Sequence, residues 1–110
     1  MGAVPDLDLA KVKKFCTDRT PPDLRDEMRV EVGVRGKSAT IFDCRAPLDD
    51  LKEWFRMPIG QLRYDPAMTG WTLYWADRND RWHLYDLIEP GRVEELLAEI
   101  ERDPTCIFWG

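Results

Sequence analysis

Six residues whose types could bind a ligand or move a proton lie in two segments of the chain: Glu31, Asp43, Arg45, Tyr74, His83 and Tyr85. Two facing carboxylates can hold a divalent cation that activates water for phosphodiester cleavage, and a histidine with an orienting partner can act as a general base. The single histidine excludes a multi-histidine metal site, and there is no Ser-His-acid, glycine-rich phosphate-loop or HExxH motif. The residue types therefore allow a carboxylate metal site or a polar aromatic binding face.

Residues 28–45 predict a first β-hairpin. Apolar side chains at every second position from Met28 to Val34 alternate with charged residues or glycine, which is the period of a strand with one buried face. A three-residue loop over residues 36–38 places Glu31 opposite Asp43, whereas a two-residue loop moves Asp43 to the side of the valines. We favour the three-residue loop because burying an unpaired carboxylate is costly.

Residues 71–87 predict a second hairpin with its turn at Arg78-Asn79, because asparagine tolerates the left-handed backbone that such turns need. An even loop gives one apolar face and one polar aromatic face, whereas an odd loop mixes tryptophan and histidine on both faces. The hydrophobic effect favours the even loop. The apolar face then carries Trp71, Leu73, Trp75, Trp82 and Leu84, and the polar face carries Thr72, Tyr74, Arg81, His83 and Tyr85.

The two preferred registers together bring all six chemically capable residues to one face of the sheet. On that face the carboxylates of Glu31 and Asp43 need a bound cation, a shared proton or the flanking arginines to neutralise them. Neutralisation by arginines gives a solvated charge lattice, which is the simpler interpretation because exposed ion pairs form readily and contribute little. His83 could use Tyr74 or Tyr85 as a neighbour, and is otherwise an ordinary half-buried side chain.

The other segments predict helices and short elements around the two hairpins. Asp8 caps a first helix over residues 9–18, and apolar residues from Val93 to Ile100 at helical spacing predict a C-terminal helix. Residues 54–57 predict a strand, and Pro58 begins either a short helix through Tyr64, which we favour, or an edge strand. The apolar tail over 106–109 either tucks onto the core or extends as an edge strand.

These elements make up one α+β domain over residues 1–110. Its sheet is mainly antiparallel, has four or five strands built from the two hairpins, and carries the terminal helices on its Trp-rich face. A length of 110 residues suits a single domain, and a 44 % hydrophobic fraction with five tryptophans excludes disorder as the main state. The net charge of −5 argues against a dedicated duplex-DNA binder. Residues 1–45 carry a net charge of +1 and residues 46–110 a net charge of −6.

The three cysteines, Cys16, Cys44 and Cys106, are odd in number and widely spaced. This pattern argues against a disulfide framework and favours a reducing cytoplasm. Because no CxxC pair is present, we expect buried thiols rather than a zinc site, and we expect no cofactor. No apolar run approaches the roughly 18 residues of a membrane span, and the first residues lack the features of a signal peptide.

Several segments resemble a bacterial family of short proteins known as domain of unknown function 3024. The segments are Asp43-Cys44-Arg45-Ala46-Pro47, Pro58-Ile59, Leu62-Arg63-Tyr64, Trp71-Thr72-Leu73-Tyr74-Trp75, Asp77-Arg78-Asn79, Trp82-His83-Leu84-Tyr85 and the ending from Asp103 to Gly110. The chain departs from the family pattern at Asp43, where glutamate is expected, and at Ala46, where proline is expected. The resemblance implies a single bacterial domain and transfers no catalytic role to any residue.

We therefore predict a non-catalytic binding or interaction module that uses the polar aromatic sheet face, with a protein or a small molecule as partner. Such a face suits a stacked base or nucleoside, and arginine beside aromatic rings also suits a protein interface. The alternative is a metal-dependent phosphodiesterase that uses Glu31 and Asp43. A third alternative is a homodimer joined by edge strands or by the tail over 107–109.

Overall fold

The computed structural model describes residues 4–49 and 53–109. Its elements are α1 (Asp6–Asp18), the short 3₁₀ helix η1 (Pro22–Leu24), β1 (Met28–Arg35), β2 (Ser38–Arg45), β3 (Phe55–Asp65), β4 (Gly70–Ala76), β5 (Trp82–Leu84) and α2 (Val93–Arg102). The five strands form one antiparallel sheet in which each strand lies beside the one before it in the chain. The predicted α+β class and flanking terminal helices are confirmed.

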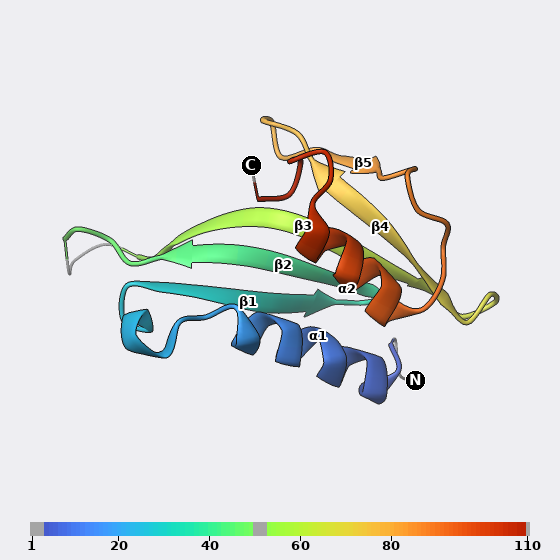
Figure 1. Ribbon diagram of the computed structural model, residues 1–110, viewed down its shortest axis with the longest axis horizontal. Helices are drawn as coiled ribbons and strands as arrows, with labels where there is room; N and C mark the ends of the chain where they lie inside the picture. The colour runs from blue at the N-terminus through green and yellow to red at the C-terminus, as the bar shows by residue number, and fades with distance from the viewer. Residues whose placement is uncertain (1–3, 50–52, 110) are drawn as a thin grey trace.

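Both α-helices lie on the same side of the sheet. Figure 1 shows α1 alongside β1 and α2 crossing in front of the middle of the sheet, in agreement with the contacts of α1 with β1 and of α2 with β3 and β4. The core fills the space between them: Val12, Cys16, Val30, Ile41, Leu62, Trp71, Leu73, Leu96, Ile100 and Phe108 are buried there. Within the described residues no helix covers the opposite side, which we call the uncovered face.

The first hairpin has a two-residue turn, so the preferred three-residue loop is wrong. Arg35 pairs with Ser38, and Gly36 has a φ of 60°, a backbone conformation that glycine adopts without strain. A glycine with positive φ at the first position is typical of a type II′ turn, which matches the twist of the strands. Asp43 consequently lies on the helix side beside Val30, where Arg45 satisfies its carboxylate.

The second hairpin pairs Tyr74 with Leu84 and Trp75 with His83, so the predicted even loop is also wrong. Its five-residue turn is held by Asp77, whose Oδ1 accepts hydrogen bonds from the backbone N–H groups at 79 and 81. This register exposes 53 % of Leu84. In exchange it places the ring of Tyr85 in the core, where the hydroxyl finds a buried partner.

β3 is one continuous strand, so the short helix expected from Pro58 to Tyr64 is wrong. Pro58 lies in the half of β3 that pairs only with β2, since β4 pairs only with Gln61–Asp65. A strand with a neighbour on one side tolerates a residue without an N–H donor. A bulge at Ile59 resets the pairing, so that Ile41 faces Gly60 while Phe42 faces Pro58.

The start of α1 differs from expectation, whereas the end of α2 agrees with it. α1 begins at Asp6 after Pro5, and the carboxylate of Asp8 accepts a hydrogen bond from Trp71 Nε1 at 2.8 Å instead of capping the helix. α2 is confirmed. Its last residue is Arg102, and the next residue, Asp103, stops the helix with a φ of 43°. The Asp103 carboxylate accepts the backbone N–H groups of Phe108 and Trp109, which folds the apolar tail onto the core.

Candidate functional site

The structure divides the six predicted site residues between the two faces of the sheet. Side chains alternate along a strand, so each register shift of one residue moves a whole set to the other face. Glu31 and Tyr74 lie on the uncovered face. Asp43, Arg45, His83 and Tyr85 lie on the side of the helices. The single face that was predicted to gather all six is therefore wrong.

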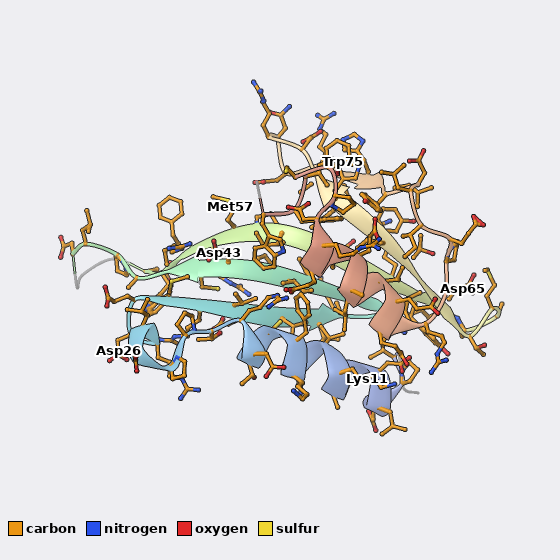
Figure 2. All side chains as sticks on the ribbon, viewed as in Figure 1. Lys11, Asp26, Asp43, Met57, Asp65 and Trp75 are labelled. Atoms are coloured by element: carbon orange, nitrogen blue, oxygen red, sulfur yellow. The ribbon has the colours of Figure 1, made fainter. Side chains whose placement is uncertain are left out.

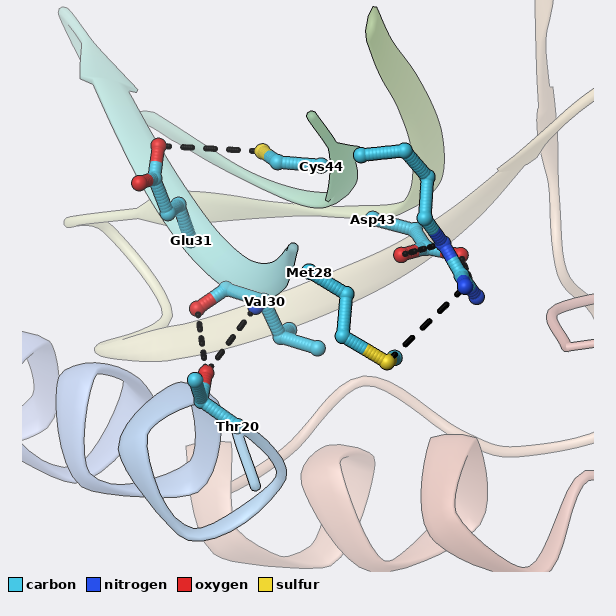
Figure 3. A network of polar contacts seen from close by, with 7 residues as sticks. Thr20, Met28, Val30, Glu31, Asp43 and Cys44 are labelled. Carbon is cyan, nitrogen blue, oxygen red and sulfur yellow. Dashed lines mark hydrogen bonds and ion pairs between the residues drawn. The ribbon is translucent and has the colours of Figure 1, made fainter. Parts of the chain in front are cut away.

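Glu31 and Asp43 do not face each other. Glu31 pairs across the ladder with Phe42, and its Oε1 lies 3.7 Å from Cys44 Sγ. Asp43 instead accepts hydrogen bonds from Arg45 Nε and Nη2, both at 3.2 Å. Figure 3 shows the two carboxylates turned to separate partners. Among the described residues no cluster of three His, Cys, Asp or Glu side chains could hold a metal ion, and the carboxylate pair proposed for phosphodiester cleavage is not formed.

His83 lies in β5, just after the β4–β5 turn. Its Nε2 lies 2.7 Å from Asp77 Oδ2, and its ring stacks on Trp75 with centroids 4.6 Å apart. The hydrogen bond with His83, aided by the backbone donors, lowers the pKa of Asp77 to about 2. The contacts of His83 thus stabilise the turn, and none of them reaches the uncovered face.

Tyr85 is buried, and its hydroxyl donates a 2.7 Å hydrogen bond to Glu99 Oε2. Burial and, secondly, this contact with Glu99 raise the pKa of Tyr85 to about 12. A side chain that is enclosed in this way cannot contact a ligand at the surface. Tyr85 is therefore a core residue.

Three arginine–aromatic stacks occupy the uncovered face. The guanidinium carbon of Arg29 lies 4.0 Å from the ring centroid of Trp54, and that of Arg56 lies 4.0 Å from the ring of Phe42. The third stack joins Arg63 to Tyr74 at 3.8 Å. The stacks form because alternation sends these side chains to the face that lacks a helix, where rings and guanidiniums from adjacent strands meet.

The charge on this face has the opposite sign to that of the whole chain. From β1, β2, Trp54 and β3, the charged side chains that point to the uncovered face are Arg29, Arg35, Arg56 and Arg63 against the carboxylates of Glu31 and Asp65. The excess is two positive charges, in a chain whose net charge is −5. Glu31 itself lies 3.5 Å from Arg29. An anionic partner would meet a favourable local field here.

A depression lies beside the Arg56–Phe42 stack. It has a volume of about 390 Å³, and Gly33, Arg35, Thr40, Phe42, Arg56 and Gln61 are among the residues that line it. A Cβ atom at Gly33 would lie 3.3 Å from the Phe42 ring and 3.6 Å from Arg56 Nη2, so the glycine leaves the stack its space. Gln61 donates to Thr40 Oγ1 at 2.9 Å and accepts from Arg63 Nε at 2.7 Å, which fixes the polar side chains of this region.

A family model matches residues 2–110, and its description is Domain of unknown function (DUF3024). The chain belongs to this family. The resemblance seen in the motifs is thereby confirmed over the whole matched range, and the family name assigns no activity. This DUF3024 chain matches none of the curated proteins and none of the solved structures with which it was compared. None of its described helices is long and apolar enough to span a membrane.

The site residues of the DUF3024 chain that were not singled out from the sequence are Phe42, Trp54, Arg56 and Arg63. Arg56 and Arg63 belong to β3, and the expectation of a helix after Pro58 hid the fact that both lie in one strand. The sequence contained a usable signal, because alternation resumes at Gln61-Leu62-Arg63 once a bulge is allowed at Ile59. Phe42 was placed on the wrong face by the three-residue loop.

A second hollow lies on the helix side, beyond the end of α2. It has a volume of about 630 Å³ and is lined by Asp43, Arg45, Ala46, Pro47, Leu48, Asp49, Glu53, Phe55 and Met57. Figure 2 shows Asp43 and Met57 at this end of the sheet. The predicted candidates Asp43 and Arg45 thus lie together in this DUF3024 chain, but their charges neutralise each other. The hollow offers a ligand the apolar side chains of Leu48, Phe55 and Met57. The Asp43–Arg45 ion pair adds no net charge to it.

Proposed function

We propose that this protein is a non-catalytic binding module that takes an anionic partner on its uncovered sheet face. The observation that supports the proposal most directly is the series of three guanidiniums stacked on aromatic rings, those of Arg29, Arg56 and Arg63. Guanidinium groups bind carboxylates and phosphates through two parallel hydrogen bonds. The three stacks therefore present anion-binding groups on the face that the fold leaves uncovered.

Stacking on a ring prepares an arginine for binding. A long side chain loses conformational freedom when it is immobilised in an interface, and this loss weakens the complex. The rings of Trp54, Phe42 and Tyr74 already restrict the arginines. Arg29 Nε and Arg63 Nε also donate hydrogen bonds within the chain, to Arg25 O and Gln61 Oε1, and the guanidinium donors not used in such contacts are left for a ligand. The binding face is thereby organised before the partner arrives.

The free thiols support a proposal about the cellular compartment of the module. Cys16 and Cys44 are buried, Cys106 is exposed, and all three are unpaired. We place the module in the reducing cytoplasm on this basis. The phosphodiesterase alternative is not carried forward, because its two carboxylates lie on opposite faces of the sheet.

Retention on immobilised heparin tests the proposal, because heparin is a strong polyanion that needs no knowledge of the natural partner. At neutral pH and about 50 mM salt we expect this acidic protein to be retained and to elute as the salt concentration rises. The triple variant R29Q/R56Q/R63Q should flow through the column. Circular dichroism and thermal unfolding check that it is folded.

A charge-matched control separates the local field from the net charge. The triple variant R78Q/R81Q/R92Q also loses three positive charges, but from the β4–β5 turn and the start of α2, away from the stacks. It should be retained like the native protein. Absence of retention for the native protein, or equal loss of retention in both triple variants, would contradict the proposal.

A further inference from the structure

The partner class follows from the arrangement of rings and charges on the uncovered face. We infer that the anionic partner is a single-stranded nucleic acid, and this inference rests on the proposed function. Such a strand carries both planar bases and phosphates, and the face carries planar cation–ring stacks together with neutral polar side chains. Bases stack on guanidinium planes as well as on aromatic rings, so the outer surface of each stacked arginine is a site for a base.

The length of the stacked region indicates a polymer. Arg56 and Arg63 belong to the same strand, β3, and are seven positions apart with one bulge between them. At roughly 3.3 Å per residue their Cα atoms are separated by about 20 Å. A mononucleotide cannot reach both stacks, whereas a strand of about four nucleotides or more can, which is the lower end of the site sizes of single-strand-binding domains.

The depression beside Gly33 supplies a place for one nucleotide along this path. Its volume of about 390 Å³ lies within the usual range for small-ligand sites, roughly 300–1,000 Å³. Arg35 and Arg56 line it and can contact a phosphate, while Thr40 and Gln61 offer neutral donors and acceptors for a base edge. By the strand register the depression lies level with the Arg63–Tyr74 stack, and Phe42 lies between it and the Arg29–Trp54 stack.

Duplex DNA and acidic peptides fit the same face less well. A duplex carries one negative charge for every 1.7 Å of its axis, and its bases are stacked on each other and cannot reach the guanidinium planes. Two surplus positive charges in a chain of net charge −5 give a duplex little to bind. An acidic peptide would satisfy the guanidiniums but has no planar groups for the stacks. The rings therefore favour a partner with bases.

Fluorescence anisotropy with labelled oligonucleotides tests the inference on the full-length protein. The probes are single strands of about 12 thymidine or 12 uridine nucleotides, a duplex of the same length, and a poly-glutamate peptide. We expect both single strands to bind at least tenfold more tightly than the duplex or the peptide. Comparing the affinities of the thymidine and uridine strands shows whether DNA or RNA is preferred. With one phosphate contacted by each of the three stacked arginines, the affinity for a single strand should fall with salt with a log–log slope of about −2.

Variants that remove a ring but keep every charge distinguish the effect of stacking from that of electrostatics. Tyr74→Leu and Phe42→Leu remove rings but leave the arginines, and each should weaken single-strand binding at least about fivefold with little effect on heparin retention. Phe55→Leu is the matched control, since Phe55 is an aromatic residue of β3, is 73 % exposed and points to the other face. Its affinity should equal that of the native protein.

The outcomes distinguish the inference from the proposed function on which it rests. Heparin retention without a preference for single strands would overturn the inference and leave an anion-binding face. Tighter binding of poly-glutamate than of the oligonucleotides would also overturn it and indicate an acidic protein partner. If neither heparin nor any oligonucleotide binds, both the inference and the proposed function fail.

Discussion

Glu99 is the most deeply buried carboxylate among the described residues, with 4 % of its surface exposed, and its environment shows how this fold accommodates a charge. Tyr85 donates a hydrogen bond to one carboxylate oxygen and Arg102 donates to the other. The hydrogen bond from Tyr85, and to a lesser degree Arg102, lowers the pKa of Glu99 despite the opposing effect of burial. The carboxylate is consequently ionised at neutral pH and depends on both donors.

Replacing Tyr85 with phenylalanine should destabilise the fold, because it leaves one oxygen of a buried carboxylate without its donor. The expected loss in the free energy of unfolding is about 1–3 kcal/mol at neutral pH. Urea denaturation followed by tryptophan fluorescence measures it. Tyr74→Phe is the control, because it removes the hydroxyl of a partly exposed tyrosine and keeps the ring on which Arg63 stacks. Equal losses in the two variants would contradict this role of Tyr85.

The same tyrosine gives the fold a dependence on alkaline pH. Its pKa is about 12 in the folded chain against an ordinary value of 10.0. Below the ordinary value the hydroxyl keeps its proton in both states, so its contribution to stability is complete. Between the two values the unfolded chain releases a proton that the folded chain retains, which favours unfolding. The native protein should therefore lose stability over this interval more steeply than Tyr85→Phe, and parallel curves would show that the tyrosine does not carry the effect.

At the scale of the elements, turn geometry decides which side chains share a face. Gly36 has a φ of 60°, and nothing lies within 4 Å of a Cβ built on it, so an alanine there meets no neighbouring atom and only the strain of its own backbone. Gly36→Ala should cost about 1–2 kcal/mol in the free energy of unfolding. Gly36→Asn should cost less because asparagine tolerates this conformation.

Chemical denaturation of both Gly36 variants measures this difference. Lys37→Ala, at the second turn position, is the control and should leave the stability nearly unchanged because Lys37 is exposed. If alanine and asparagine at position 36 cost the same, the backbone of the turn is not what sets the register.

Alternation was enough to predict β1, β2 and β4 but not how the strands pair. The period-two pattern located β1, β2 and β4, and the helical stripe located α2, because each depends on local spacing alone. Register depends on partners that are distant in sequence. Arg45 makes the burial of Asp43 acceptable, so the rule against burying an unpaired carboxylate selected the wrong first loop. Glu99 does the same for Tyr85, so grouping the apolar side chains on one face selected the wrong second loop.

The candidate site was predictable to the same limited extent. Tyr74 and Glu31 were expected on a polar aromatic face, and the structure places both on the uncovered face. The arginines of β3 were not expected there, since proline is ordinarily excluded from a strand interior and Pro58 suggested a helix. The bulge at Ile59 and the missing neighbour of that half of β3 remove this objection, and neither can be seen in local spacing.

At the scale of the whole molecule, the two helices and the C-terminal tail close one side of the sheet as a single unit. Phe108 packs against Tyr85 with ring centroids 5.0 Å apart and lies against Gly60, so the last residues of the chain contact the middle of the sheet. This seating leaves Phe108 buried and unavailable to a second copy of the chain. The tail over 107–109, expected as one of two possible dimer contacts, therefore has one of its apolar side chains enclosed in the core.

The three thiols report whether this closed unit opens only as a whole. Cys16 lies between α1 and the sheet, and burial raises its pKa to about 12; Cys44 is buried in β2, and burial together with Glu31 raises its pKa. Cys106 is exposed in the tail. We expect a disulfide reagent at mildly alkaline pH to modify Cys106 at least about a thousandfold faster than the other two thiols. A domain of ordinary stability is fully unfolded for less than about one thousandth of the time, and the buried thiols react only then.

Increasing the urea concentration below the unfolding transition sharpens this test. If helices, sheet and tail form one cooperative unit, Cys16 and Cys44 become reactive through the same global opening, and their rates rise with the same denaturant dependence as the unfolding equilibrium constant. The variant Cys106→Ser removes the fast reaction and isolates these two thiols. Modification of Cys44 at low urea with little denaturant dependence would instead show that β1 and β2 separate locally, which would make the uncovered face less rigid than its stacked arginines imply.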